Sequence, residues 1–413
     1  MKQTKHMFYT AAEAAELLGI TNATLYSYVS RGVIRSENGP GKSRRYSAAD
    51  IDALLTKKDF RKHPEHIAAT SLYWGAPTLE TKLTYIDGKD VYYKGRQVTE
   101  LAGAYTFEEV ASFLWTDSFS AVKITDSSTV LLQKAEELTH TNTIFSAVDI
   151  IDKIQSLLPV IGSLDPVAYE TSPNVIMRIG AEIIVLETAI VTGSFASGGT
   201  IAERLCAAWH GNIADEIKNT LNTALILIAD HELNISAFTA RCAASAGTTP
   251  YRSVTAALSA FQGTKHGAAV ERVAAFFAAA ASAPSVAEAI SAALRRGEII
   301  PGFGHPLYPE GDPRAAYLLG QLEQTHSADP ALERIRAVCA YMETTLGTHP
   351  NIDLALYALA QAIGAPADAP KLLFVIGRTA GWIAHILEQT AAGALIRPRA
   401  KYTGVIPAVD QVK

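Results

Sequence analysis

One stretch of this sequence combines a titratable side chain, a cation and a rigid backbone. Residues 299–314 read Ile-Ile-Pro-Gly-Phe-Gly-His-Pro-Leu-Tyr-Pro-Glu-Gly-Asp-Pro-Arg, which places His305 and Arg314 among prolines and glycines. Because proline fixes the backbone and glycine frees it, a loop of defined shape is predicted here, between two helical patterns. A long, rigid loop that presents an imidazole and a guanidinium is a common way to build a site. The alternative is a surface linker with an incidental histidine.

Four further places put polar side chains where helical patterns should be apolar: 230–234, 263–269, 349–353, and Arg378 together with the basic stretch 396–404. Each has a simple alternative explanation. His231 could be a buried core histidine and Asp353 a helix cap. Arg378 could pair with a neighbouring carboxylate, and Arg397 could be a surface charge. No His or Cys spacing typical of a metal site and no glycine-rich nucleotide-binding motif is present.

The elements that must position these groups lie in two parts of different charge. The chain has 413 residues, 48% of them hydrophobic, so it can hold two or three domains with a large core. Residues 1–66 carry eleven Lys and Arg against seven Asp and Glu, which leaves 25 basic against 34 acidic residues in the remainder. We expect no membrane association and a cytoplasmic protein, because the N-terminus has no apolar signal core and no apolar run approaches the length of a membrane span.

The basic first part reads as helices and short strands. Thr10 can cap a helix over Ala11–Leu18, and Thr21 can cap a second helix over Asn22–Ser30. Two short extended pieces follow between Val33 and Tyr46, and Ser47 can cap a last helix through Leu55. This order resembles the small winged helix-turn-helix module of the excisionase and mercury-resistance-regulator families.

That resemblance implies DNA as a possible partner of residues 1–66. A helix-turn-helix places its second helix in the major groove, and basic residues contact the phosphates. The candidates for such contacts are Arg31, Lys42, Arg44 and Arg45. The alternative is a packing or oligomerisation module whose charges are solvated.

The acidic body is predicted to be almost wholly helical, so the fold class is mainly α. The exception is a small hairpin, in which residues 83–86 and 91–93 flank a turn at Asp87-Gly88-Lys89-Asp90. The long Ala/Leu/Ile-rich stretches elsewhere are interrupted by short Gly/Pro loops, which carry most of the polar groups described above.

Taken together, the motifs of the body resemble citrate synthase from about residue 71 to residue 404. They occur in the family's order and spacing as Asp230-His231-Glu232, Lys265-His266-Gly267, the stretch 301–314, Pro350-Asn351-Ile352-Asp353, Arg378-Thr379-Ala380-Gly381-Trp382 and Arg397-Pro398-Arg399. The resemblance implies a two-domain helical fold, with residues 67–265 as the first part of a large domain, 266–357 as a small mobile domain and 358–413 as the C-terminal part of the large one. Residues 1–66 hold the winged helix-turn-helix module and a linker.

The family's reaction joins acetyl-CoA to oxaloacetate and then hydrolyses the citryl thioester to citrate and CoA. A thioester α-proton is a very weak acid, so the carbonyl oxygen needs a hydrogen-bond donor while the base removes the proton. By resemblance, Asp353 is the base, His266 stabilises the enol and His305 polarises the ketone. The CoA thioester is a substrate, and no cofactor is bound permanently.

The resemblance also implies binding residues. Arg314, Arg378 and Arg397 would hold the carboxylates of oxaloacetate, a task that suits bidentate guanidinium groups. His231 would touch the same substrate and Phe374 would line the pocket. Arg397 would reach in from the other subunit, which implies a homodimer. The backbone around the adenine of CoA would come from Pro301, Gly302, Phe303 and Gly304.

Two choices stay open at this level. The chain departs from the family at Leu307, Pro309, Glu310, Lys265 and in Leu354-Ala355-Leu356 after the predicted base, and the last change could reshape the acyl pocket. A 2-methylcitrate synthase uses propionyl-CoA, and one methylene gives only about 1–3 kcal/mol of discrimination. The alternative of another class is a metabolite-sensing regulator that binds DNA.

Overall fold

The computed structural model of the chain describes residues 8–31, 33–38, 44–47, 50–51, 54, 79–120, 122–124, 129–326, 329–400 and 402–405. The chain forms two compact units, Met1–Glu80 (unit 1) and Thr81–Lys413 (unit 2). The predicted boundary at residue 66 and the predicted DNA contact Lys42 lie outside the described residues. No helix among the described residues is both long and apolar enough to cross a membrane.

Unit 1 confirms the two predicted helices, α1 (Ala11–Leu18) and α2 (Asn22–Ser30). Both begin at the predicted caps, because Thr10 Oγ1 accepts from Glu13 N and Thr21 Oγ1 accepts from Thr24 N, each at 3.3 Å. The Glu13 carboxylate accepts from Thr10 N at 2.8 Å, which completes a reciprocal cap. These bonds satisfy backbone N–H groups that a helix start leaves free.

A small antiparallel sheet accompanies these helices. Strand β3 (Arg44–Ser47) pairs with β2 (Ser36–Asn38) on one side and with β1 (Phe8–Tyr9), which was not predicted, on the other. Residues 50, 51 and 54 are helical, and Asp50 N donates to Ser47 Oγ at 3.3 Å, as expected for a cap at Ser47. The core of unit 1 is formed by Ala14, Leu18, Leu25, Ile34, Tyr46 and Ile51.

Unit 2 starts with the predicted hairpin, β4 (Thr84–Ile86) and β5 (Val91–Tyr93), to which the structure adds β6 (Arg96–Gln97). Tyr93 anchors this sheet to the core. Its side chain is fully buried, and its hydroxyl accepts from Asp230 N at 2.9 Å and lies 3.1 Å from Ile226 O. The sheet thereby fixes the segment that leads into His231.

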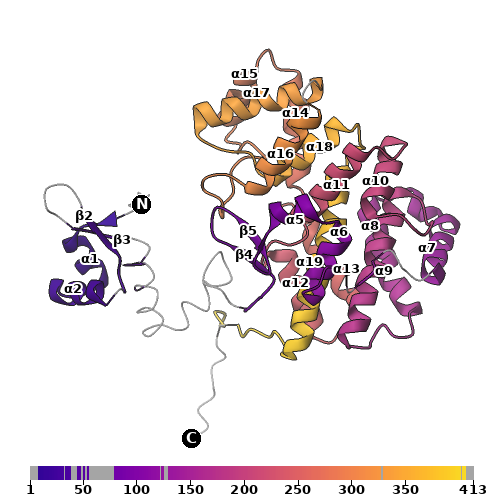
Figure 1. The fold of residues 1–413 in the computed structure, drawn as a ribbon, viewed down its shortest axis with the longest axis horizontal. Coiled ribbons are helices and arrows are strands. Elements are labelled where there is room, and N and C mark those ends of the chain that lie inside the picture. Colours follow the sequence, from indigo (N-terminus) through magenta and orange to yellow (C-terminus); the bar gives the residue numbers. More distant parts are fainter. Residues whose placement is uncertain are drawn as a thin grey trace, which may run out of the picture. The chain divides into compact units, whose positions relative to one another are not determined.

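The rest of unit 2 is helical (Figure 1), as predicted. The elements are α5 (Val98–Ala104), α6 (Phe107–Thr116), α7 (Thr129–Thr141), η2 (Thr143–Ser146), α8 (Ile150–Leu164), α9 (Pro173–Thr192), α10 (Ile201–His210), α11 (Asp215–Leu227), α12 (Ile235–Ser245), α13 (Pro250–Phe261), α14 (Ala269–Ala281), α15 (Val286–Arg295), α16 (Pro313–Thr325), α17 (Pro330–Tyr341), η3 (Met342–Leu346), α18 (Ile352–Ala362) and α19 (Ala369–Ala392).

Helix α19 runs through the core and places one site residue. It spans Ala369–Ala392, and glycines allow its backbone to approach the segment after α11. A Cβ atom added to Gly381 would lie 2.4 Å from Ala229 O, and Gly381 N donates to that oxygen at 2.9 Å. Only glycine fits this contact. Arg378 lies one turn earlier on the same helix.

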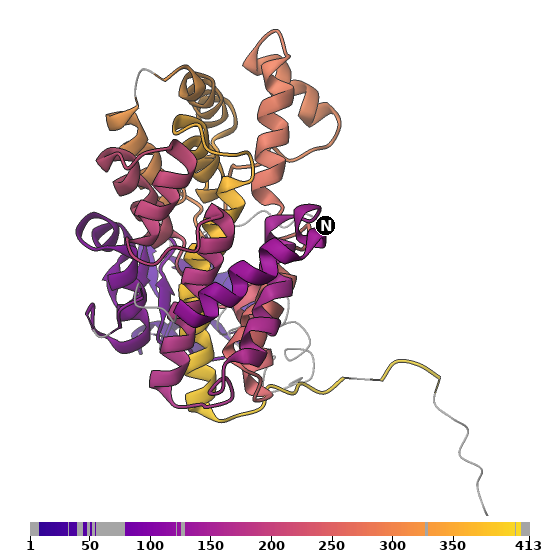
Figure 2. The ribbon, with the colours of Figure 1, turned by 90° about the vertical axis from the view of Figure 1, so that its right-hand side faces the viewer.

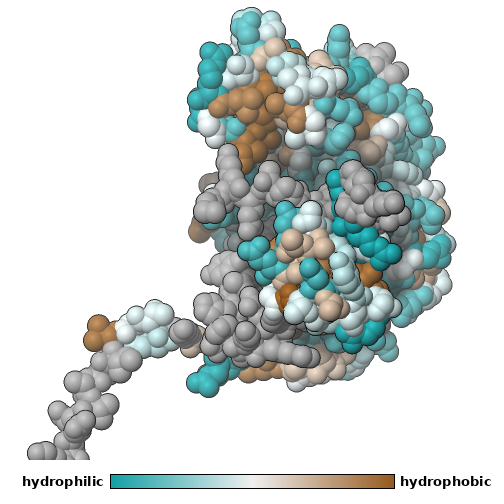
Figure 3. Space-filling model, turned by 90° about the vertical axis from the view of Figure 1, so that its left-hand side faces the viewer, coloured by the Kyte–Doolittle hydropathy of each residue, from teal (hydrophilic) through white to brown (hydrophobic). Residues whose placement is uncertain are grey.

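Helices α14 to α18 form a group on one side of unit 2, shown in orange at the top of Figure 1. Figure 3 shows a hydrophobic patch on this group, whose exposed large hydrophobic residues are Leu294, Ile299 and Leu346. The group overlaps the predicted small domain 266–357. Since Thr81–Lys413 is one compact unit, the division of the body at residues 265 and 357 stays a prediction.

The chain leaves the helical body after α19. Gly393 ends the helix with a φ of 62°, and Ile396 N donates to Ser245 Oγ at 3.1 Å. The following residues run away from the helices in an extended course (Figure 2). Most of their described side chains are exposed, including that of Arg397.

Candidate active site

His231 follows α11 in a tight turn, in which Glu232 has a φ of 54°. The imidazole is only 9% exposed, and its Nε2 lies 2.6 Å from the hydroxyl of Tyr308. Burial, followed by the charges of Arg314 and Arg378, lowers the pKa of His231 well below its usual value. The ring is therefore neutral at pH 7, and it is a core histidine that also faces the cationic groups of the site.

His305 lies beside it on the loop that connects α15 to α16. The two rings are perpendicular, with centroids 5.3 Å apart, and the Tyr308 ring is 4.7 Å from that of His305. Burial and the charge of Arg314 lower the pKa of His305 to about 4, so the ring is neutral. Its Nδ1 accepts from Leu307 N at 3.2 Å. The proton of the neutral ring must then be on Nε2, which makes Nε2 the donor.

Arg314 is held at the start of α16 by Asp312, the helix cap. The guanidinium donates from Nε to Asp312 Oδ1 at 3.0 Å and from Nη2 to Oδ2 at 2.9 Å, and both side chains are buried. Although burial opposes it, the negative charge of Asp312 raises the pKa of Arg314 above its usual value. Nη1 takes part in none of these bonds and is left to bind an anion.

Arg378 is buried without a carboxylate partner among the described residues. Its Nε donates to Ile228 O at 2.8 Å, and its guanidinium lies 4.6 Å from the ring centroid of Phe374. Burial lowers the pKa of Arg378 to about 10, which leaves it charged at neutral pH. The ion pair considered from the sequence is thus absent within the described part of the chain. A buried, unpaired cation favours an anionic ligand.

His266 lies between α13 and α14 against aromatic rings. Its centroid is 5.4 Å from that of Phe261 and 6.4 Å from that of Phe374. Its Nε2 is 2.9 Å from Ser236 Oγ, which accepts from Trp382 Nε1 at 3.2 Å and donates to Asn234 Oδ1 at 2.7 Å. Burial and the charge of Arg378 lower the pKa of His266 to about 4, so this imidazole is neutral as well.

Asp353 stands in the first turn of α18. Asn351 caps this helix, since its Oδ1 accepts from Asp353 N at 3.1 Å. Burial raises the pKa of the Asp353 carboxyl to about 6, while the charge of Arg314 acts in the opposite direction. The carboxylate accepts no hydrogen bond from any described residue. The helix-cap role considered from the sequence belongs to Asn351, and Asp353 is free to take up a proton.

The stretch predicted to surround the CoA adenine is tied to the segment before Asp353. Gly304 N donates to His349 O at 2.8 Å, and Asn351 N donates to Gly302 O at 2.9 Å. Gly302 has a φ of 85°, and a Cβ there would meet Leu354 Cβ at 3.0 Å. Packing within the protein therefore already requires this glycine. Phe303 is buried, and Pro301 is half-buried.

The structure brings most of the predicted groups together. The charges of Arg314 and Arg378 both influence the pKa values of His231 and Asp353. The charge of Arg314 also lowers the pKa of His305, and that of Arg378 lowers the pKa of His266. Phe374 joins them by stacking on Phe261, with centroids 5.0 Å apart. Arg397 is the exception, because it is exposed on the segment after α19 and contacts none of the described site residues.

Sequence reasoning gave no role to several residues that hold these groups. Asp312, Tyr308 and Ser236 stand in or next to the quoted motifs, which was the only signal for them. The buried Asp230 carboxylate accepts from the Thr84 hydroxyl, and its Oδ1 lies 3.2 Å from His385 Nε2. Among the described residues, no group of three or more His, Cys, Asp or Glu could hold a metal ion.

In unit 1, the described residues predicted to contact DNA are exposed. Arg44 and Arg45 lie on β3, and Arg31 ends α2, where its guanidinium lies 5.3 Å from the ring centroid of Tyr28. Arg31 Nε also donates to Ser27 O at 3.2 Å. None of the three is paired with a carboxylate within the described residues.

Comparisons with known proteins agree with this fold. The model of the citrate synthase C-terminal domain matches residues 72–399, and a helix-turn-helix domain model matches residues 8–59. The larger match defines a condensing enzyme, an acyltransferase that forms a carbon–carbon bond. The chain belongs to the citrate synthase family, and it carries an additional N-terminal helix-turn-helix domain.

Relatives within the family have two kinds of name. The chain is 27% identical to 2-methylcitrate synthase 1 of Corynebacterium glutamicum, over 77% of this chain and 90% of that protein. It is 28% identical to the citrate synthase of Haloferax volcanii, over 80% and 94%. Its fold resembles the citrate synthase of Thermoplasma acidophilum, solved in ternary complex with carboxymethyl coenzyme A and oxaloacetate (TM-score 0.69, 24% identity, 82% and 97% coverage).

Proposed function

We propose that the chain condenses acetyl-CoA with oxaloacetate to give citrate and CoA. The supporting observation is that Asp353 has a pKa of about 6, that none of the described residues donates a hydrogen bond to its carboxylate, and that the charges of two buried guanidiniums act on it. A base with a pKa near neutrality is suited to removing a carbon-bound proton. Asp353 takes a proton from the acetyl methyl group, and the carbonyl oxygen becomes an enol oxygen.

His266 stabilises that oxygen in this proposal. To donate from Nδ1, the neutral ring must accept at Nε2, which requires the Ser236 hydroxyl, 2.9 Å away, to turn its proton from Asn234 Oδ1, at 2.7 Å, to His266. The Trp382 N–H donates to Ser236 Oγ and so does not compete for that proton. Oxyanion-type stabilisation of this kind is commonly a large part of the rate enhancement.

Oxaloacetate occupies the cationic part of the site. Arg314 and Arg378 bind its carboxylates, His231 contacts it, and Phe374 lines the wall. His305 donates from Nε2 to the ketone oxygen and supplies the proton as the alkoxide forms. The enol carbon attacks the ketone carbon, and water then hydrolyses the citryl thioester to release CoA.

Three further elements complete the proposal. Arg397 of a second copy supplies the remaining cation, which makes the enzyme a homodimer; its exposed position away from the other groups supports this arrangement. Pro301, Gly302, Phe303 and Gly304 surround the adenine. Residues 266–357 act as a small domain that closes over 67–265 and 358–413 and excludes water during the reaction.

The test is release of free thiol, followed side by side with acetyl-, propionyl- and butyryl-CoA in the presence of oxaloacetate. We expect the highest kcat/KM with acetyl-CoA. A higher value with propionyl-CoA would identify a 2-methylcitrate synthase, the alternative that the relatives' names also support. No thiol release with either acyl-CoA would refute the enzymatic proposal.

A second candidate function is sequence recognition on DNA by unit 1, in a regulator whose body binds metabolites. Its support is the exposure of α2, on which only Leu25 is buried, together with the exposed Arg44 and Arg45 on β3. Polar side chains on an exposed second helix and cations on a neighbouring strand are the parts that groove and phosphate contacts require.

A further inference from the structure

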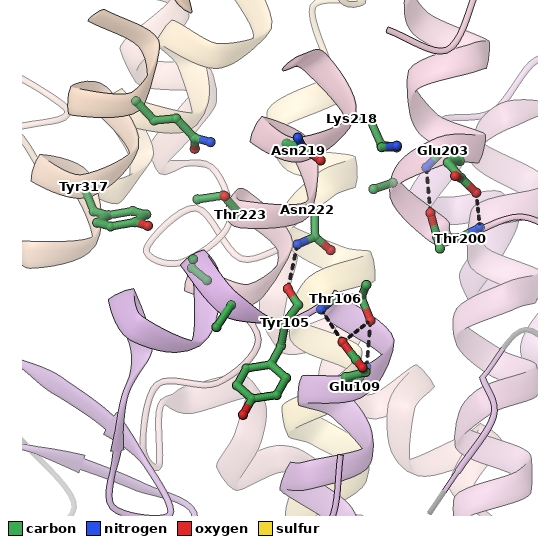
Figure 4. A pocket seen from close by; sticks show the side chains of 15 residues that line it. Tyr105, Thr106, Glu109, Thr200, Glu203, Lys218, Asn219, Asn222, Thr223 and Tyr317 are labelled. Carbon is green, nitrogen blue, oxygen red and sulfur yellow. Dashed lines mark hydrogen bonds between the residues drawn. The ribbon is translucent and has the colours of Figure 1, made fainter. Parts of the chain in front are cut away.

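A cavity of about 590 Å³ lies in unit 2 among α5, α6, α10, α11 and α16 (Figure 4). None of the residues that line it belongs to the candidate active site. Its size is within the range of small-molecule sites. Most of its lining residues are polar, among them Glu109, Glu203, Lys218, Asn219, Tyr317 and Gln321.

Two helices connect this cavity to the active site. Helix α16 carries Arg314 in its first turn, and Tyr317 and Gln321, one and two turns later, line the cavity. Helix α11 lines the cavity from Lys218 onwards, and its last turn leads to Ile228, whose carbonyl oxygen accepts from Arg378. A molecule that contacts both helices therefore restrains Arg314 relative to Arg378.

Hydrogen-bonding groups in the cavity lack partners. Gln321 Oε1 is buried and accepts no hydrogen bond from the part of the chain that the structure describes. The Tyr317 hydroxyl, which a Cβ at Gly103 would approach to 3.0 Å, also has no partner among the described residues, and the Asn219 amide is exposed and open to a ligand. A buried acceptor without a donor is unfavourable, so a ligand that supplies the donor should bind about tenfold more tightly.

The charges of the cavity select the class of ligand. Glu109 and Glu203 each cap a helix with Oε2, at 2.7 Å from Thr106 N and 2.8 Å from Thr200 N, and their Oε1 atoms remain available within the described structure. Lys218 is engaged by Asp215 at 2.7 Å. The cavity therefore contains two carboxylates and one ammonium group whose charge Asp215 already balances. This charge disfavours anions such as acyl-CoA or oxaloacetate and favours a ligand that donates hydrogen bonds.

We propose that this cavity is a regulatory site for an uncharged small molecule with several hydroxyl or amino groups, and that its occupation tightens the binding of oxaloacetate. The donors of the ligand bond to Gln321 Oε1 and to a Glu carboxylate, while its acceptors take the Tyr317 hydroxyl and the Asn219 amide. The effect on oxaloacetate rests on the proposed condensation reaction, whereas binding to the cavity does not.

The experiment uses cytidine and myo-inositol as probes on the full chain. Calorimetry at about 10 mM probe is expected to detect saturable binding of at least one of them, and that probe is expected to lower the KM for oxaloacetate at least about threefold. Gln321→Met removes the acceptor at similar volume and should weaken binding about tenfold. Asn219→Trp fills the cavity and should abolish binding, whereas Gln133→Trp, on the exposed face of α7, should not.

Each result decides a separate question. Binding of neither probe, or binding that survives Asn219→Trp in a folded protein, overturns the cavity as a ligand site. Binding to the cavity without any change in KM overturns its regulatory role. If thiol release is absent while calorimetry shows binding that Asn219→Trp removes, the proposed reaction fails and the ligand site stands.

Discussion

The carboxylate of Asp312 accepts hydrogen bonds from both Nε and Nη2 of Arg314, at 3.0 and 2.9 Å. The same carboxylate accepts from Ile352 N at 3.1 Å, at the start of the helix that carries Asp353. The buried Asp312 side chain thus orients Arg314, a candidate substrate-binding cation. It also anchors the helix that carries the candidate base Asp353, which lies 41 residues further along the chain.

Asp312→Asn is expected to impair both stability and binding. Breaking a buried ion pair leaves an uncompensated charge, which costs about 3–5 kcal/mol of unfolding free energy. The KM for oxaloacetate should rise about tenfold or more, because Arg314 loses its fixed orientation. Denaturant titration and thiol release measure the two effects. Glu310→Gln is the control, since Glu310 is exposed and pairs with Lys89 only at 3.6 Å, so about 0.5 kcal/mol or less is expected.

The pKa of Asp353 predicts an acid limb in the pH profile. A base must be deprotonated to act, so kcat/KM should fall as the pH decreases through about 6. The pKa values of His266 and His305, about 4, lie outside this range, so both rings stay neutral across it. Asp353→Asn should lower kcat by about 10²–10⁴-fold and remove the limb from the residual activity. A limb that persists in this variant would assign it to another group.

The same raised pKa has a consequence for stability. The folded-state value of about 6 exceeds the usual 3.8, so the contribution of this group is fully present below about pH 3.8 and is lost as the pH rises through 6. At pH 8, the free energy of unfolding of Asp353→Asn should therefore exceed that of wild type by about 1–3 kcal/mol. This range takes into account that Asp353 is only half-buried. This gain should shrink towards pH 4, and a gain that grows instead would contradict the assigned pKa.

Sequence reasoning located the residues but not the bonds between them. The caps Thr10 and Thr21, both unit 1 helices and the hairpin at 83–93 were predictable, because their signals lie within a few residues. The bond from Ile352 to Asp312 and the contact of His231 with Tyr308 join positions 40 and 77 residues apart. Such bonds depend on how helices pack, which local patterns do not encode.

Packing also decided between alternatives that the sequence left open. Arg378 could have been half of an ion pair, and only the fold shows its Nε on a backbone carbonyl. Strands β1 and β6 have two residues each and were missed, because alternation cannot be recognised over two positions. Neither the sequence nor the fold of one chain places Arg397 next to the other site residues. Its role in the site of a partner subunit stays a prediction.

Ser236→Ala is expected to reduce turnover more than binding. Without the hydroxyl, His266 Nε2 loses its hydrogen-bond partner, and the tautomer that donates from Nδ1 is no longer favoured. We expect kcat to fall about 10–100-fold with a smaller change in KM. Thr239→Ala on the same helix is the control, because its hydroxyl bonds only to Ile235 O. An equal loss in both variants would point to a defect of α12 instead.

For unit 1, Arg44→Ala combined with Arg45→Ala should weaken DNA binding in a gel shift. Removing two phosphate contacts reduces the slope of log K against log salt by about 2 and weakens binding to all sequences alike. Lys134→Ala with Arg295→Ala removes two exposed cations from unit 2 and serves as the matched control. If no complex forms even at low salt with wild-type protein, the second candidate function is excluded.

The proposed sharing of Arg397 between two copies predicts that two inactive variants complement each other. Arg397→Ala should raise the KM for oxaloacetate strongly, and Asp353→Asn should lower kcat by about 10²–10⁴-fold. In a hybrid dimer of the two, one site combines both lesions, whereas the other has an intact Asp353 and receives an intact Arg397 from its partner. Hybrid dimers freed of both parental dimers should then have about half of wild-type activity, one intact site of two.

If Arg397 acts within its own subunit, the expected activity of the hybrid dimer is different. If Arg397 served its own subunit, every site in the hybrid would carry one lesion, and mixing would restore nothing. Co-expression with two affinity tags, purification through both tags and thiol release at saturating acetyl-CoA measure the restored fraction. Mixing Arg397→Ala with wild type provides the reference for pairing efficiency. Because Arg397 is exposed, its replacement should leave the fold of each subunit unchanged, so loss and recovery of activity report on the shared site alone.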